Sequence, residues 1–132
     1  MSSYPDDRFY SKSHEWVRVE GDTATIGITD HAQKELGDVV FVELPDVGEI
    51  FDEGQEFGTI ESVKAVSELF LPIAGEIVEV NKGLVDEPNA VNEDPHGDGW
   101  LVRIKISSDA EFDELMNAAA YEKFLEEEEK KA

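Results

Sequence analysis

Lys64 stands between two strand-like segments, 57–60 and 66–71, in the sequence Glu-Ser-Val-Lys-Ala. Every other charged residue between Glu35 and Lys82 is acidic. A short connection between two strand-like runs is typical of a hairpin turn. An isolated amine at such a turn can be modified without competition from neighbouring lysines, and it can form a stable amide with a carboxylic acid. The local residues also allow a simpler interpretation, a solvated surface lysine.

The sequence contains no cysteine, which excludes a disulfide, a cysteine-ligated metal and a thiol nucleophile. The histidines His14, His31 and His96 lack metal-ligand spacing, so we predict no metal site. We interpret His14 and His31 as hydrogen-bonded structural groups. No glycine-rich phosphate loop and no pairing of a nucleophile with a base is visible. Any redox or thioester-like chemistry would therefore need sulfur supplied on a prosthetic group.

The sequence is strongly acidic, with 32 Asp and Glu against 11 Lys and Arg and a formal net charge of -21. Such a surface repels phosphate backbones and anionic lipids, so we expect no nucleic-acid partner and no membrane partner. Two explanations of the charge stay open. The chain is a halophilic protein from a high-salt cytosol, or it is an ordinary acidic carrier that docks on basic patches of its partners. Salt should raise thermal stability in the first case, because it screens self-repulsion.

The length of 132 residues favours a single domain over 1–132 with one modest core. No segment approaches the ~20 apolar residues that cross a bilayer. Residues 1–7 show neither a basic segment followed by an apolar one nor an Arg-rich transit pattern, which favours the cytoplasm of a prokaryote. We expect 1–8 to form a loose N-terminus.

The elements that must position the lysine begin with two strands. Segments 15–20 and 23–28 alternate in residue type and are separated by a Gly-Asp turn. A brief helix is expected over 30–36, with Asp30 as its N-cap and Gly37 just past its end.

From residue 39 to residue 106 the sequence is typical of an all-β domain, because apolar runs alternate with Gly, Pro, Asn and Asp turns. Segment 85–99 carries two Pro and several Asn and Asp, so we expect a surface loop. Segment 109–129 is expected to be helical, with a bend or second helix near Asn117, where the apolar stripe changes phase. The fold class is therefore mainly β, with a short N-proximal helix and C-terminal helices. The expected strands in the central region are 39–42, 57–60, 66–71, 77–80 and 100–106.

From about Ser13 to Leu125 the sequence resembles the H-protein family of the glycine cleavage system. Several long blocks in the same order make this resemblance specific. The blocks are Ser-His-Glu-Trp-Val (13–17), Ile-Gly-Ile-Thr-Asp (26–30), Leu-Gly-Asp-Val-Val-Phe-Val-Glu-Leu-Pro (36–45), the lysine segment (61–65), Pro-Ile-Ala-Gly-Glu-Ile (72–77), Val-Asn (80–81) and Asp-Gly-Trp-Leu (98–101).

The resemblance implies a flattened β barrel of the barrel-sandwich hybrid type, with lipoate amide-linked to Lys64 at a hairpin tip. Glu61, Ser62, Val63 and Ala65 would form the recognition context of that lysine. The chain would be a carrier and not an enzyme, because the sulfur chemistry would belong to lipoate.

The implied partners are four enzymes. The glycine decarboxylase (P protein) loads an aminomethyl group from glycine, and the aminomethyltransferase (T protein) removes it. The dihydrolipoyl dehydrogenase (L protein) reoxidises the arm, and a lipoate-attaching enzyme installs it.

Water destroys a sulfur-bound aminomethyl group, so a carrier benefits from folding its loaded arm against its own surface. The resemblance points to Ser13 and Glu15 as members of such a cleft. Glu35 and Glu68 are further acidic candidates, because carboxylates bind a protonated amine. Some relatives carry a histidine at the position of Glu35, so no imidazole role is carried over there. An ordinary strand-edge carboxylate is the open alternative for Glu15.

Four other functions are alternatives for such a sequence. A biotinyl domain typically has Met on both sides of its lysine, whereas Val63 and Ala65 flank Lys64 here. Lipoyl domains of 2-oxo acid dehydrogenase complexes usually show Asp-Lys-Ala and are shorter. A lipoate relay to such complexes stays open as an alternative or added role, while a freestanding enzyme is disfavoured by the missing catalytic groups.

Overall fold

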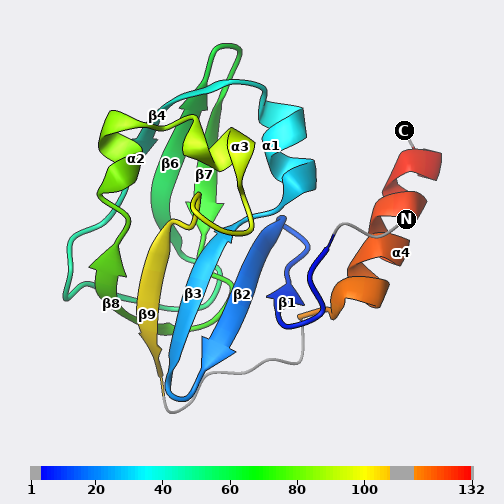
Figure 1. Cartoon of the computed structure of the whole chain (residues 1–132). Coiled ribbons are helices and arrows are strands. Elements are labelled where there is room, and N and C mark those ends of the chain that lie inside the picture. The colour runs from blue at the N-terminus through cyan, green and yellow to red at the C-terminus, as the bar shows by residue number, and fades with distance from the viewer. Residues whose placement is uncertain (1–3, 108–114, 132) are drawn as a thin grey trace.

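Two antiparallel β-sheets make up most of the computed structural model, which describes residues 4–107 and 115–131 (Figure 1). The larger sheet has six strands and the smaller has three. In order of pairing, the larger sheet contains β1 (Phe9–Tyr10), β2 (Glu15–Glu20), β3 (Thr23–Ile28), β9 (Val102–Ile106), β8 (Gly75–Val80) and β5 (Ile50–Phe51). The smaller sheet contains β4 (Val39–Glu43), β6 (Glu56–Ser62) and β7 (Val66–Phe70). The helices are α1 (Asp30–Leu36), α2 (Gly83–Asp86), α3 (Ala90–Glu93) and α4 (Ala118–Lys131).

The main core lies between the two sheets. Val42 and Ile60 come from the smaller sheet, and Ile26, Ile77 and Ile104 come from the larger one, and all five belong to one buried cluster. Each fully buried Ile side chain contributes about 1.5–3 kcal/mol relative to an exposed one. The two packed sheets carry the β6–β7 hairpin, and the expected mainly β fold class is confirmed.

A second, aromatic cluster attaches α4 to the larger sheet. The rings of Tyr10 and Tyr121 stack with centroids 4.9 Å apart, and Tyr4 packs edge-on against both. Arg8 is 7% exposed and lies 4.5 Å from the centroid of the Trp16 ring. Tyr4 and Arg8 thus pack against the body of the fold, within the segment 1–8 for which a loose N-terminus is expected, and residues 1–3 lie outside the described residues.

Helix α1 has the expected bounds, but its N-cap is Thr29 and not Asp30. The Thr29 Oγ1 accepts a hydrogen bond from the Ala32 backbone N–H at 3.2 Å. Asp30 instead accepts from the Lys34 ammonium at 3.0 Å. Gly37 ends the helix with φ of 80°, a left-handed value that glycine adopts without a Cβ penalty.

The expected surface loop over 85–99 is only partly correct. It contains α3 and the end of α2, and these short helices bury Val91 and Leu84 in the main core. Each of these four-residue helices buries one apolar side chain, which is too weak a periodic signal to reveal them in the sequence.

At the other end, α4 begins at Ala118, which agrees with a separate helix after Asn117. Residues 108–114, where the first part of the expected helical segment falls, lie outside the described residues. Among the helices of the described residues, none is long and apolar enough to span a membrane.

Candidate functional site

Lys64 lies at the tip of the β6–β7 hairpin, as the sequence predicts (Figure 1). The backbone N–H of Ser62 donates to the Ala65 carbonyl at 2.8 Å and closes the turn. The Ser62 Oγ accepts from the backbone N–H groups of Lys64 at 3.3 Å and of Ala65 at 3.1 Å. The Val63 N–H donates to the Asp38 carbonyl at 3.0 Å, which ties the tip to the strand beside it. The turn that carries the lysine is therefore held by side-chain and backbone bonds from both sides.

The Lys64 side chain is exposed and runs beside the C-terminal end of α1. A Cβ added at Gly37 would lie 3.5 Å from the Lys64 Cε, an ordinary van der Waals distance, so the lysine stem passes beside this glycine. The residues on either side of it, Val63 and Ala65, are exposed as well. The amine is thus accessible to a modifying enzyme.

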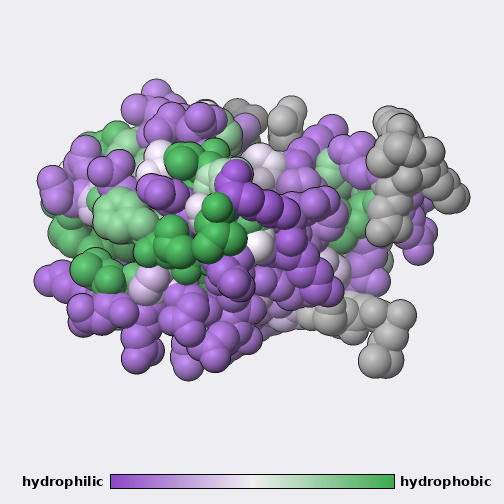
Figure 2. All heavy atoms as spheres, turned by 90° about the horizontal axis from the view of Figure 1, so that it is seen from above, coloured by the Kyte–Doolittle hydropathy of each residue, from purple (hydrophilic) through white to green (hydrophobic). Residues whose placement is uncertain are grey.

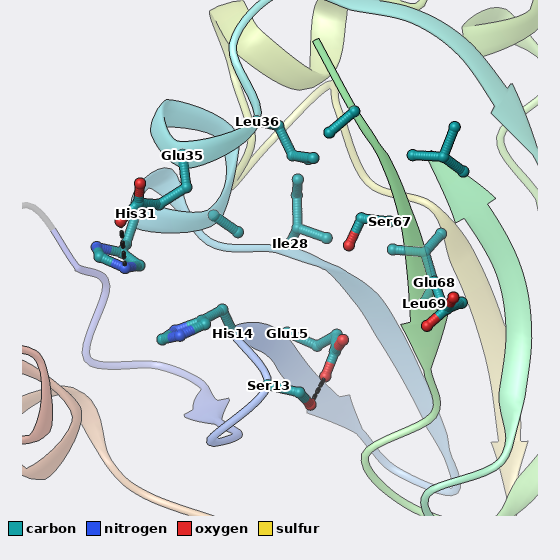
Figure 3. A pocket seen from close by; sticks show the side chains of 13 residues that line it. Ser13, His14, Glu15, Ile28, His31, Glu35, Leu36, Ser67, Glu68 and Leu69 are labelled. Atoms are coloured by element: carbon teal, nitrogen blue, oxygen red, sulfur yellow. Dashed lines mark hydrogen bonds and ion pairs between the residues drawn. The ribbon is translucent and has the colours of Figure 1, made fainter. Parts of the chain in front are cut away.

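A cavity of about 400 Å³ opens next to the hairpin tip (Figure 3). Its walls come from the turn before β2, from the end of β3, from α1 and from β7. The lining residues are Ser13, His14, Glu15, Ile28, His31, Ala32, Glu35, Leu36, Ala65, Val66, Ser67, Glu68 and Leu69.

The cavity combines apolar side chains with the carboxyl of Glu15, which lies at the end far from the lysine. Leu36 directly precedes the glycine that touches the lysine stem, and Ala65 directly follows Lys64. Glu15 lies at the other end, because its carboxylate accepts a hydrogen bond from the N–H of Phe70, the last residue of β7. Figure 3 shows Leu36 on one side of the cavity, with Ser13 and Glu15 on the opposite side.

Glu15 is a buried carboxyl without a cationic partner among the described residues. It is 2% exposed, and its Oε1 accepts from the Ser11 hydroxyl at 2.8 Å and from the Ser13 hydroxyl. Its Oε2 accepts from the Phe70 N–H at 3.4 Å. Burial raises the pKa of Glu15 to about 7. The hydrogen bonds from Ser13, Ser11 and Phe70 lower the pKa, but burial has the larger effect. Burial and a raised pKa distinguish this group from an ordinary strand-edge carboxylate.

All four residues predicted for an arm cleft line this one cavity. Ser13 and Glu15 meet in a hydrogen bond at its end far from the lysine. Glu35 and Glu68 are exposed and stand at the rim, Glu35 with its Oε1 3.6 Å from the His31 Nε2. The sequence does not show which of these four side chains are buried and which are exposed, because burial depends on the elements that pack over each residue.

Sequence reasoning missed several members of the wall. His14 is hydrogen-bonded, as expected, with its Nδ1 2.7 Å from the Tyr121 Oη, but it also faces the cavity with His31. Ser67 pairs with Ile60 and so shares the inner face of the smaller sheet. Strand alternation was the signal that could have identified Ser67.

Exposed apolar side chains also lie on and beside the strands that carry the lysine turn. We call Val40, Phe41, Val63 and Val66 the apolar collar, since they are 48%, 51%, 70% and 65% exposed. Phe41 pairs with Glu61, and Glu61 pairs with Val66, so these three side chains lie in a row on the outer face of the smaller sheet. Figure 2, which views the molecule from above, shows hydrophobic side chains gathered among hydrophilic ones on the end where the hairpin tip lies.

Comparisons with known proteins agree with this geometry. A family model described as glycine cleavage H-protein matches residues 8–128. The chain belongs to the glycine cleavage H-protein family. It is 56% identical to the glycine cleavage system H protein of Rubrobacter xylanophilus over 129 residues, covering 98% of this chain and 100% of that protein. It is 54% identical to the one from Herpetosiphon aurantiacus over 128 residues, covering 97% and 98%.

A solved structure of the same family confirms the fold. The crystal structure of a glycine cleavage system H protein from Mycobacterium marinum superposes with a TM-score of 0.82 at 42% identity, covering 89% of this chain and 95% of that one. Membership of this family makes the chain a carrier subunit of the glycine cleavage system and not a catalyst. The predicted resemblance and the barrel-sandwich architecture are confirmed.

Proposed function

We propose that Lys64 carries lipoate through an amide on its Nζ, and that the chain shuttles the aminomethyl group of glycine from the P protein to the T protein. The L protein then reoxidises the arm, whose dithiol chemistry the bound lipoate supplies. One observation carries the proposal: an exposed amine at a hydrogen-bonded hairpin tip stands next to a cavity that holds apolar side chains and a buried carboxyl. A long arm with a hydrocarbon stem and an amine-bearing end fits such a cavity.

The residues of the chain would have distinct tasks toward such an arm. Ile28 and Leu36 offer apolar contacts to the stem. Glu15 and Ser13 offer oxygen acceptors to a protonated amine at the far end, and the cation would in turn favour the ionised form of Glu15. Glu35 and Glu68 at the rim add negative charge where the amine enters.

The apolar collar would dock on partner enzymes. Acidic side chains surround it, among them Glu43, Glu61 and Glu68, so a complementary partner surface has an apolar centre and a basic rim. The lipoate-attaching enzyme has the strictest need for this surface, because it acts on the lysine amine before any arm can reach outward. With a net charge of -21, neither a nucleic acid nor a membrane is a proposed partner. The proposed location is the cytoplasm of a prokaryote.

Intact-mass spectrometry of the protein from its native host tests the attachment. We expect one lipoyl group, mapped to Lys64, and complete loss of modification in Lys64→Arg with an unchanged melting temperature. Arginine keeps the positive charge but offers no acylable amine. Lys34→Arg is the matched control, since Lys34 is also an exposed lysine close to the cavity.

Two outcomes would contradict the proposal. One is native protein that supports glycine cleavage without any group on Lys64. The other is lipoylated protein that fails in a glycine–bicarbonate exchange assay with the P protein, which would favour lipoate relay to other complexes.

A further inference from the structure

The hydroxyl of Tyr121 joins the C-terminal helix to two walls of the cavity. Tyr121 is fully buried on α4, and its Oη lies 2.7 Å from the His14 Nδ1 and 2.8 Å from the Thr29 Oγ1. His14 belongs to the turn that ends in Glu15, and Thr29 caps the helix on the other side. One oxygen atom of a residue outside the cavity thus contacts both walls.

The turn around His14 has an uncommon backbone conformation. His14 has φ of 70°, in the left-handed region that few residues other than glycine adopt. Its N–H donates to the Ser11 carbonyl at 3.0 Å, and its carbonyl accepts from the Thr29 N–H at 3.0 Å. The same turn presents the Ser13 hydroxyl to Glu15. Any relaxation of His14 would therefore move the Glu15 end of the cavity.

Thr29 connects the Tyr121 hydroxyl to the opposite wall. Its Oγ1 caps α1 by accepting from the Ala32 N–H at 3.2 Å. Ala32 and Leu36 of that helix line the cavity. The position of α1 relative to the His14 turn is thus set partly by the two hydrogen bonds of one phenol.

We infer that Tyr121 is a positioning residue for the arm site. Its hydroxyl fixes the His14 turn relative to α1 and so keeps the side chains of Ser13 and Glu15 oriented toward the arm. Tyr121 does not line the cavity itself. Its ring packs against Tyr10 and Tyr4, a task that phenylalanine would also perform. The Tyr121 hydroxyl does not contribute to that ring packing. Burying a hydroxyl costs free energy unless it forms hydrogen bonds. The inference rests on the proposed function for its effect on the arm.

Tyr121→Phe tests the inference, and Tyr10→Phe is the matched control. Tyr10 is also fully buried in the aromatic cluster, but its hydroxyl donates to the Pro5 carbonyl at 2.6 Å, away from the cavity. Both variants lose a bonded hydroxyl, so both should melt at a lower temperature. Only Tyr121→Phe should shorten the time for which the loaded, lipoylated protein resists hydrolysis, by about fivefold for a lost bond worth about 1 kcal/mol.

A second measurement uses protein without lipoate. In NMR titrations, Tyr121→Phe should shift the His14 imidazole resonances and lower the pKa of Glu15 toward its ordinary range, because the opened turn admits water. Tyr10→Phe should leave both as in the unsubstituted protein. The inference is overturned if Tyr121→Phe leaves the His14 and Glu15 titrations unchanged, or if the two variants change the hydrolysis time equally. A failure of the proposed function would appear separately, as an unsubstituted loaded protein that gives its arm no protection.

Discussion

Glu15 should make the folded protein less stable as the pH rises from about 4.5 to about 7. Burial raises the pKa of this carboxyl from 4.5 to about 7 in the folded chain. In that window the folded protein holds a proton on Glu15 that the unfolded chain has released, so raising the pH favours unfolding. The difference between the two pKa values corresponds to about 3 kcal/mol of free energy of unfolding. Since Glu15 is only 2% exposed, solvent screening reduces this figure little.

Glu15→Gln isolates this contribution. The amide has the shape of the protonated carboxyl and never ionises, so the variant should match the unsubstituted protein at pH 4.5 and be more stable by up to about 3 kcal/mol above pH 7. Urea unfolding at several pH values measures the difference. About 1 M KCl should be present throughout, because it screens the repulsion among the many other carboxylates, which also titrate with pH.

Glu20→Gln is a suitable control, because Glu20 is an exposed carboxyl at the far end of the same strand. Its stability difference from the unsubstituted protein should be small and nearly constant over the whole range. The reasoning about Glu15 would be refuted by a stability difference for Glu15→Gln that does not change between pH 5 and pH 8. It would also be refuted by a variant that is less stable than the original at pH 8.

Three further predictions concern charge, packing and docking. Thermal stability should rise between about 0.05 M and about 1 M KCl, because salt screens the net charge of -21; a melting temperature indifferent to KCl would contradict the halophilic interpretation. Gly27→Ala should cost about 1–3 kcal/mol in urea unfolding, since a Cβ there would lie 2.7 Å from three atoms of the Trp16 ring. Gly83→Ala should change stability little, because the Cβ there would meet only the Asn81 Oδ1 at 3.3 Å. An equal loss of stability in Gly27→Ala and Gly83→Ala would show that the close contact with the Trp16 ring is unimportant. Phe41→Ser in the apolar collar should lower kcat/KM for lipoylation of Lys64 about fivefold, as expected for about 1 kcal/mol of lost apolar burial. Ile50→Ser should leave kcat/KM unchanged, because Ile50 is 73% exposed on β5 of the other sheet. Similar kcat/KM values for the two variants would argue against docking at the collar.

Local signals predicted the elements near the lysine well. The sequence predicts the helix over 30–36 because Gly37 marks its end, and Gly37 has a positive φ there, which glycine adopts without a Cβ penalty. Its N-cap was misassigned because Thr29 and Asp30 are both good caps, and only the position of the Ala32 N–H distinguishes them. The packing of Arg8 was missed, since it depends on Arg8 finding the ring of Trp16.

The sequence by itself determined the family, the mainly β fold class, the absence of thiols and the isolation of Lys64 at a turn. These properties depend on residue types and on neighbours within a few positions along the chain. The tertiary structure alone decided that Glu15 is buried beside the N–H of Phe70, 55 positions away, and that His14 is held by Tyr121, 107 positions away. A carboxyl's pKa and the width of a cavity are set by whatever folding packs around them, so no local pattern in the sequence could reveal either.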